Sequence, residues 1–500
     1  MSRASVIARQ AARLFTGTLL ARALDLLFYF ILASRLGVAG FGRYMFALSF
    51  TLLFSALGDL GISTVFTREV SRAPGRTREL LRRCLSVKLA LSVVTLLAVP
   101  VAAGFGPGGR DSLALVVPLA IAMLLNSTSL LFDGLLRAAG RAGRSGLNLT
   151  LQSATVLASG VALLALGFGP HAGAYAMLIG AVVRVGSSVV WSSDLWGRRP
   201  DVPPTTADMD ALPARSARAL LREAAPLALS GIFIALYFRI DSVILRAVQG
   251  EAAVGLYAGA YRMFEAFAML AVTFRSVLFP VMARAADGPA GSLAVLCRKS
   301  IRLHLLFTFG IAVFFTFEAP AVVRAVLGPG YAAAAPALAI LIWALPGSYM
   351  ADTLLFLITA QRRQSLVTWA VGIAAVANVV MNLLLVRRFS ILGASAATVA
   401  TEWLSFALLF AMFQRAAPMP GVAAVVWRPL AAGAVLAAAL ALGAARLPGG
   451  PGGLVLAGAG SLVVYALALV ALGAFTRADL DVARGLVRGG AARAGEGAGS

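Results

Sequence analysis

Long apolar runs separated by short polar segments dominate the sequence, and most reach the roughly 20 residues that a helix needs to cross a bilayer. The sequence predicts about 14 transmembrane helices, over residues 14–34, 43–66, 84–103, 112–136, 147–168, 171–191, 219–247, 256–283, 300–317, 332–358, 366–386, 391–413, 426–445 and 453–473. Run 300–317 is short. The residues ahead of Pro226 predict an interfacial amphipathic turn, and 318–331 predicts a short re-entrant or interfacial piece.

The longest polar break divides these runs into two groups. It covers residues 192–218 and is rich in Asp and Pro. We expect an N-terminal six-helix bundle over 1–191, this break as a cytoplasmic linker, and a C-terminal six-helix bundle over 219–413. Two accessory helices follow within 414–473. Residues 474–500 form a cytoplasmic tail whose Gly/Ala/Arg-rich composition is typical of disorder.

Basic residues are distributed unequally between the two ends of the predicted helices. With the N-terminus inside, the inner segments hold 29 Lys and Arg and the outer segments eight. Since cytoplasmic loops carry an excess of these residues, both termini are predicted to lie in the cytoplasm. The loop containing Arg387 and Arg388 fits this pattern least well.

An internal repeat links the two groups of runs. Residues 37–44 and 250–257 both read G-x4-G-x-Y, at an offset of 213, and each joins two successive runs. Cys84 and Cys297 share the offset. An even number of runs separates the copies, so they are parallel and related by an axis along the membrane normal, as in transporters that bind substrate between two halves. The alternative is that Gly-x-Tyr merely suits a short outer turn.

Composition places the chain in lipid. The 500 residues are 60% hydrophobic and 13% charged, with a mean hydropathy of +0.89. No soluble domain could bury so much apolar surface. The net charge of +22 would suggest nucleic acid as a partner of a soluble protein, but here the basic residues fill cytoplasmic loops, so no nucleic-acid partner is expected.

Chemical motifs for catalysis are not found. Two Cys and two His give neither a disulfide framework nor a zinc site. There is no P-loop and no G-x-S-x-G motif. We therefore expect no enzymatic activity, no cofactor and no metal, and we expect any energy for transport to come from an ion gradient or the membrane potential.

Charged residues at bilayer depth are the clearest functional signal, because an ionisable group there is costly and usually faces a cavity or a partner. They lie in the first, seventh and eighth runs: Arg22, Asp25, Arg239, Asp241, Arg262, Glu265 and Arg275. Arginine stays charged and binds phosphate bidentately, so the four arginines could line a cavity for an anionic group. The alternative is structural pairing of Arg22 with Asp25 and of Arg262 with Glu265, each three residues apart on one helical face.

Other intramembrane charges have weaker patterns. Arg184, near the inner end of its run, is expected to snorkel to the surface, and Asp59 and Asp133 also lie near inner ends. Asp352 and Glu402 have no basic residue nearby in sequence. Either could carry a coupling proton or sodium ion, and the alternative is a carboxyl group paired across helices.

Three segments resemble the bacterial polysaccharide-export flippases. Residues 238–263 (FRIDSVILRAVQGEAAVGLYAGAYRM) look like the family's seventh-to-eighth helix signature, residues 34–62 like its first-to-second helix segment, and residues 392–403 (LGASAATVATEW) like its twelfth helix. The resemblance covers nearly the whole chain. The family belongs to a superfamily that includes lipid II flippases and multidrug/cation antiporters.

The resemblance implies a flippase that moves undecaprenyl-diphosphate-linked oligosaccharide units from the inner to the outer leaflet of the bacterial plasma membrane. It implies two six-helix bundles around a central cavity, with two extra helices. The implied partners are the lipid-linked oligosaccharide, membrane lipids, a polysaccharide polymerase and glycosyltransferases. The substrate-binding positions that match are Arg22, Arg239, Arg262, Arg275, Asp25 and Asp241.

Two other functions remain open from sequence. A multidrug/cation antiporter of the same superfamily is one, although four mid-membrane arginines suit an anionic headgroup better. A membrane-embedded polysaccharide polymerase or ligase is the other. Such an enzyme needs a sizeable outer loop, and the longest outer segment, 318–331, is short and mostly apolar.

Overall fold

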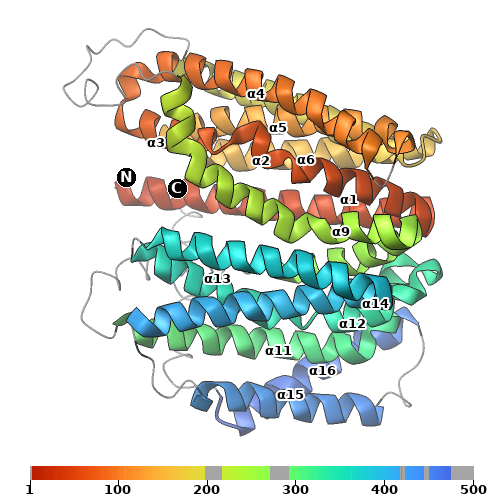
Figure 1. Ribbon diagram of the computed structural model, residues 1–500. Coiled ribbons are helices and arrows are strands. Elements are labelled where there is room, and N and C mark those ends of the chain that lie inside the picture. Colours follow the sequence, from red (N-terminus) through yellow and green to blue (C-terminus); the bar gives the residue numbers. More distant parts are fainter. Residues whose placement is uncertain are drawn as a thin grey trace, which may run out of the picture.

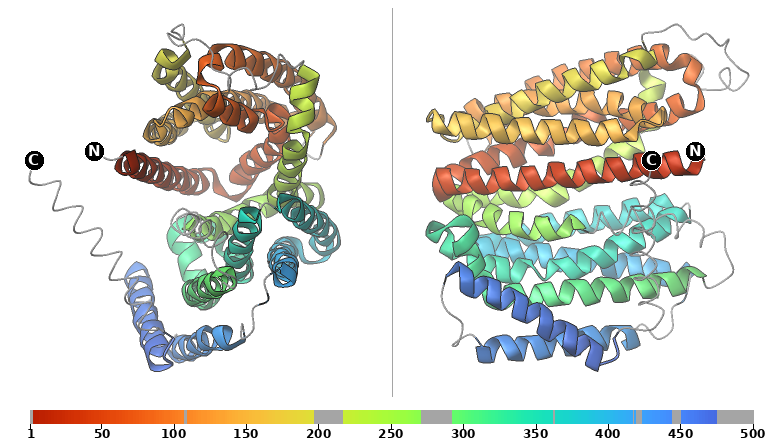
Figure 2. Two further views of the ribbon diagram at one scale, coloured as in Figure 1. Left: turned by 90° about the vertical axis from the view of Figure 1, so that its left-hand side faces the viewer. Right: turned by 180° about the vertical axis from the view of Figure 1, so that it is seen from behind.

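The computed structural model describes residues 3–106, 109–196, 217–270, 292–361, 363–416, 418, 423–443 and 450–474, and every regular element in these ranges is a helix. Helices suit a chain in lipid because they satisfy their backbone hydrogen bonds internally. The long helices run roughly side by side, so that their ends gather at two faces (Figures 1 and 2). Their bounds are α1 Arg3–Leu53, α2 Ser55–Asp59, α3 Ile62–Arg72, η1 Pro74–Arg76, α4 Thr77–Phe105, η2 Arg110–Ser112, α5 Leu113–Ala138, α6 Ala142–Ala165, α7 His171–Trp196, α9 Ala217–Ala268, α11 Ser292–Leu327, η3 Pro329–Ala334, α12 Ala335–Leu341, α13 Ala344–Ala360, α14 Gln364–Ala416, α15 Ala423–Gly443 and α16 Pro451–Ala471.

Three of these helices each contain two membrane spans. The backbone leaves helical geometry at Gly37 in α1, Gly250 in α9 and Ser390 in α14. A straight helix as long as α1 would measure about 75 Å at about 1.5 Å per residue, more than twice the roughly 30 Å of hydrocarbon. In the described ranges ten helices are long and apolar enough to cross, or up to 11 with the bent α12–α13 pair. Counting α1, α9 and α14 as two spans each, the prediction of about 14 spans is confirmed.

Several predicted boundaries are wrong. Helix α11 is 36 residues long and continues through Pro320, so 300–317 is part of a full span and 318–331 is not a re-entrant piece. The predicted run 332–358 is broken, with a 45° bend between Pro329–Leu341 and Ala344–Ala360. The predicted run 43–66 is interrupted by left-handed residues at Leu60 and Gly61.

The two copies of the repeat have matching conformations. Gly37 (φ 65°) and Gly250 (φ 85°) both adopt the left-handed backbone that glycine tolerates. The tyrosines that end the two motifs, Tyr44 and Tyr257, are both buried. The two cysteines at the same offset are also buried, as free thiols in α4 and α11.

The copies also touch each other, through Gly42 and Gly255. A Cβ atom on Gly42 would lie 1.9 Å from the backbone oxygen of Glu251, and one on Gly255 would lie 2.0 Å from that of Val38. Since 38 and 251, like 42 and 255, differ by the repeat offset, the contact is reciprocal about an approximate two-fold axis. Small residues permit this close approach of helix backbones in membranes. The sequence repeat is therefore a physical contact between α1 and α9.

Charged groups accompany this contact. The Glu251 carboxylate accepts hydrogen bonds from Arg43 of α1, with NH2 to Oε2 at 3.1 Å, and from Arg246 of α9, with NH2 to Oε1 at 2.8 Å. Arg43 thus joins the two copies by an ion pair.

Helices α1 and α9 lie at the centre of the molecule. Figure 1 shows α3 to α6 on one side of them and α11 to α14 on the other, with α15 and α16 outermost against α11. The main hydrophobic core joins both sides and includes Phe28 and Tyr44 of α1 and Tyr257 of α9. The central pair is therefore in the position to line a cavity between the two sides.

We expect Gly42→Ala to destabilise the protein by about 1–3 kcal/mol, the usual cost of overpacking, because the added methyl group would overlap backbone atoms of α9. The measurement is the temperature at which the full-length protein in detergent loses its monodisperse state. Gly104→Ala in α4 is the matched control, since its Cβ would meet nothing within 4 Å. Equal effects of the two substitutions would contradict a close α1–α9 contact.

Candidate functional site

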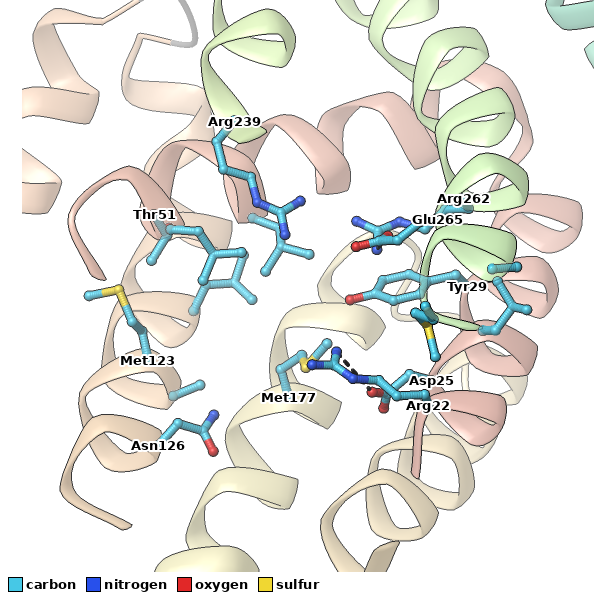
Figure 3. A pocket seen from close by; sticks show the side chains of 17 residues that line it. Arg22, Asp25, Tyr29, Thr51, Met123, Asn126, Met177, Arg239, Arg262 and Glu265 are labelled. Carbon is cyan, nitrogen blue, oxygen red and sulfur yellow. Dashed lines mark hydrogen bonds and ion pairs between the residues drawn. The ribbon is translucent and has the colours of Figure 1, made fainter. Parts of the chain in front are cut away.

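A cavity of about 310 Å³ lies between α1, α5, α7 and α9 (Figure 3). Both arms of α1, before and after Gly37, contribute to its wall, as do both arms of α9, before and after Gly250. Most of its polar groups come from these two helices, and α5 supplies one amide. The polar lining residues are Arg22, Asp25, Tyr29, Thr51, Asn126, Arg239, Arg262 and Glu265.

Arg262 is held firmly in the wall. Its NH1 donates to Glu265 Oε2 one helical turn away, and its guanidinium lies over the ring of Tyr29, 4.2 Å from the ring centroid. Only 8% of its side chain is exposed. A cation stacked on an aromatic face and paired with a carboxylate has a fixed position. The structural pairing considered for Arg262 and Glu265 is thus present, inside the cavity wall.

Arg22 and Asp25 form a looser pair on the first arm of α1. The closest distance, NH1 to Oδ2, is 3.9 Å, and 59% of the Arg22 side chain is exposed. At this distance and exposure the attraction between the two groups is small. Arg22 therefore remains able to meet another anion in the cavity.

Arg239 is the cavity arginine without a carboxylate of its own. Among the described residues, no acidic oxygen lies within the 4.0 Å that defines an ion pair with it. Figure 3 shows its guanidinium pointing into the cavity from α9. In the described part of the lining, three arginines face two carboxylates, so the cavity has excess positive charge.

One predicted substrate-binding residue, Asp241, does not line this wall, and another is not described. Arg275 lies outside the described residues. Asp241 lies in a smaller neighbouring pocket with Tyr257 and Tyr261, and its Oδ1 accepts from the backbone N–H of Ser242 at 2.6 Å. The two-residue spacing of Arg239 and Asp241 puts them on different faces of α9, so only the arginine reaches the larger cavity.

Glu402 and Asp352 lie elsewhere, on α14 and α13. Glu402 is buried, with 6% of its surface exposed, and the side chains of Tyr237 of α9 and Ser348 of α13 lie near its carboxyl group. Neither acid is among the cavity-lining residues of the described chain. The two carboxyl groups are close enough to influence each other electrostatically.

The expectation that Arg184 snorkels to the surface is wrong. It is 9% exposed, and its NH2 donates to Oδ2 of Asp133 at 2.9 Å. Asp133 on α5 also accepts from Asn148 Nδ2 of α6 at 3.2 Å. Partners on two other helices, which sequence spacing cannot reveal, keep the arginine inside.

Lys88 is a buried cation that the sequence reasoning did not single out. It is 0% exposed, and its Nζ lies 2.6 Å from Oδ1 of Asp59 and 2.8 Å from the Ser63 hydroxyl. These groups surround the break between α2 and α3, where helix hydrogen bonding is interrupted. The available signal was a lysine within an apolar run of an otherwise arginine-rich chain.

Asn126 is the second missed residue, and it lines the cavity on α5. Its side-chain oxygen accepts from Gln152 Nε2 at 2.8 Å and from Arg184 NH1 at 3.3 Å. The available signal was an asparagine in the middle of the run 112–136. A neutral amide is less exceptional in a membrane helix than a charge, so the sequence alone does not distinguish Asn126 as a site residue.

Solved membrane transporters share this fold. A structure described as lipid II flippase MurJ in an inward closed conformation aligns with a TM-score of 0.73 and 13% identity, covering 91% of this chain and 97% of that chain. An inward-facing MATE-family multidrug resistance transporter of the MOP superfamily aligns with a TM-score of 0.62 and 18% identity, covering 81% of this chain and 95% of that chain. An outward-facing structure of a MATE-family transporter aligns with a TM-score of 0.57 and 19% identity, covering 84% of this chain and 96% of that chain. No match was found among curated proteins.

The fold and the charged cavity thus define a multi-span, all-α membrane protein of the kind seen in MurJ and MATE transporters. The family model described as polysaccharide biosynthesis protein matches residues 7–286, more than half of the sequence. The chain belongs to this family.

We expect Asp133→Ala to lower stability by about 3–5 kcal/mol, because it would leave Arg184 buried without its carboxylate. The measurement is again the temperature at which the full-length protein in detergent loses its monodisperse state. Asp194→Ala, which removes an exposed ion pair with Arg141, should have little effect.

Replacing both partners, Asp133→Leu with Arg184→Met, should recover part of the loss, since no unpaired charge then remains buried. A double variant no more stable than Asp133→Ala would contradict the assignment of this pair.

Proposed function

We propose that the protein is a flippase for undecaprenyl-diphosphate-linked oligosaccharide units in the bacterial plasma membrane. The observation that carries the proposal is the excess of arginine in the cavity, above all Arg239, which has no acidic partner among the described residues. Arginine stays charged, and its planar fork binds phosphate groups bidentately, which suits a diphosphate. Membership of the polysaccharide biosynthesis family and the fold shared with a lipid II flippase support this substrate class.

The diphosphate would bind among Arg22, Arg239, Arg262 and Arg275, with Asp25 orienting Arg22. The glycan would occupy the rest of the cavity, and the lipid tail would stay in the bilayer. Asp241 would act from the neighbouring pocket, by positioning the α9 arm that carries Arg239.

Transport would follow alternating access between the two predicted six-helix bundles, 1–191 and 219–413. In the described conformation the copies of the repeat are in contact at Gly42 and Gly255. The excess of Lys and Arg in the predicted inner segments supports an arrangement with this contact at the outer face and both termini in the cytoplasm. Substrate would enter from the cytoplasmic side and leave when the contact opens. Glycosyltransferases would act before this step and a polymerase after it.

We expect Arg239→Ala, and separately Arg275→Ala, to reduce polymer export about 10- to 100-fold in a strain that depends on this protein. Loss of a hydrogen bond to a charged group costs about 1.5–3 kcal/mol. The measurement is the amount of exported polymer at equal levels of membrane-inserted protein.

Arg35→Ala is the control, because Arg35 is an exposed arginine of α1 that does not line the cavity. Full export by the Arg239→Ala variant would contradict the proposal. Loss of resistance to cationic drugs with normal export would favour an antiporter instead.

For coupling, we propose that Glu402, with Asp352 beside it, carries a proton or sodium ion. Glu402→Gln should abolish the acceleration of transport by an imposed proton or sodium gradient in vesicles, with transport down a substrate gradient retained. Asp111→Asn, at an exposed carboxyl near the end of α4, should keep the acceleration. A gradient response that survives in Glu402→Gln would exclude this role.

A further inference from the structure

We propose that Asn126 is a specificity-determining residue whose side-chain NH₂ group donates to the glycan part of the substrate. This inference rests on the proposed function and assigns the cavity wall formed by α5 and α7 to binding of the glycan. It depends on the orientation of one amide, which a chain of hydrogen bonds inside the N-terminal helices determines.

The chain begins at a residue that can only donate. Arg184 is anchored by its NH2 on Asp133, and its NH1 lies 3.1 Å from the Gln152 side chain. Because a guanidinium has no acceptor, the Gln152 atom that it meets must be Oε1. The Gln152 NH₂ group is therefore the end that faces Asn126.

The same reasoning fixes the next amide. Gln152 Nε2 and Arg184 NH1 both donate, at 2.8 and 3.3 Å, to one atom of Asn126. Two donors require an acceptor, so this atom is Oδ1, and Nδ2 takes the other position. Figure 3 shows the nitrogen of Asn126 on the cavity side and the oxygen turned away. Among the described residues, no acceptor lies within hydrogen-bond distance of Nδ2.

The surroundings of Nδ2 favour a neutral, hydroxyl-rich ligand. Asn126 and Met123 project from α5 and Met177 from α7, whereas the cavity arginines come from α1 and α9. A thioether is soft and adapts to irregular surfaces, which suits the C–H face of a sugar ring. A diphosphate held by the arginines would leave its glycan beside this wall, where an N–H donor can bind a sugar oxygen.

The test compares two probes on the full-length protein in lipid nanodiscs. One is farnesyl diphosphate and the other is farnesyl diphosphate linked to N-acetylglucosamine. Wild type should bind the sugar-bearing probe more tightly. Asn126→Ala should lower the affinity for that probe about tenfold, which corresponds to the loss of one hydrogen bond, and leave the affinity for the sugarless probe unchanged.

Two further variants separate binding from folding. Asn378→Ala removes another buried asparagine, bonded to Thr401 on α14 away from the cavity, and should leave the ratio of the two affinities unchanged. Asn126→Asp keeps the oxygen that Gln152 and Arg184 bind and loses the donor, so it should weaken the sugar-bearing probe at least as much as Asn126→Ala.

Several outcomes would overturn the inference. One is unchanged affinity for the sugar-bearing probe in either Asn126 variant. Another is an equal loss of affinity for both probes in Asn126→Ala, which would place the amide on the diphosphate. Arg239→Ala should weaken both probes, and this result tests the proposed function separately. Failure of wild type to bind either probe would refute the proposed function, and this inference with it.

Discussion

The backbone contact between Gly42 and Gly255 is the constraint on which the rest of the structure depends. It sets the distance between α1 and α9, the helices that lie between the two sides of the molecule. From this contact the second arms of both helices continue to Thr51 and Glu265, about 14–15 Å further along at about 1.5 Å per residue. Both residues line the cavity. The second arms of α1 and α9 thus touch near their first residues and carry the cavity-lining polar groups further along.

Charge in this cavity is divided between fixed and available groups. Arg262 is paired with Glu265 and stacked on Tyr29, so its side chain has a fixed position in the wall. Arg239 has no carboxylate within ion-pair distance among the described residues, so its guanidinium is available to another anion in a region of low dielectric, where electrostatic interactions are strong. The deeper pair Arg184 and Asp133 carries no excess charge. Its effect on the cavity is transmitted through the orientation of neutral amides.

Sequence patterns predicted the membrane class, the number of spans, the repeat and the charged half of the cavity, because each has a local signature. A charge in an apolar run is exceptional, and Gly37 and Gly250 stand at the same place in two copies of one motif. The deep position of Arg184, the Lys88–Asp59 pair and the role of Asn126 depend on residues 25 to 58 positions away. Such pairings are set by helix packing, which periodicity does not encode. The run 43–66 does not predict the break between α2 and α3, because the apolar residues continue on both sides of the short Gly-Asp-Leu-Gly segment at 58–61.

The contact between the two repeat copies is close in space and weak in energy. A pair of nonbonded heavy atoms contributes about 0.1–0.2 kcal/mol, and glycines bring few such atoms. The adjacent ion pair has 51% of the Arg43 side chain exposed, and pairs of this kind contribute about 0–1 kcal/mol. The glycine contact and its ion pair therefore fix the register of the two copies while adding little free energy to their association, so the strength of that association comes from the buried side chains of α1 and α9 around the contact.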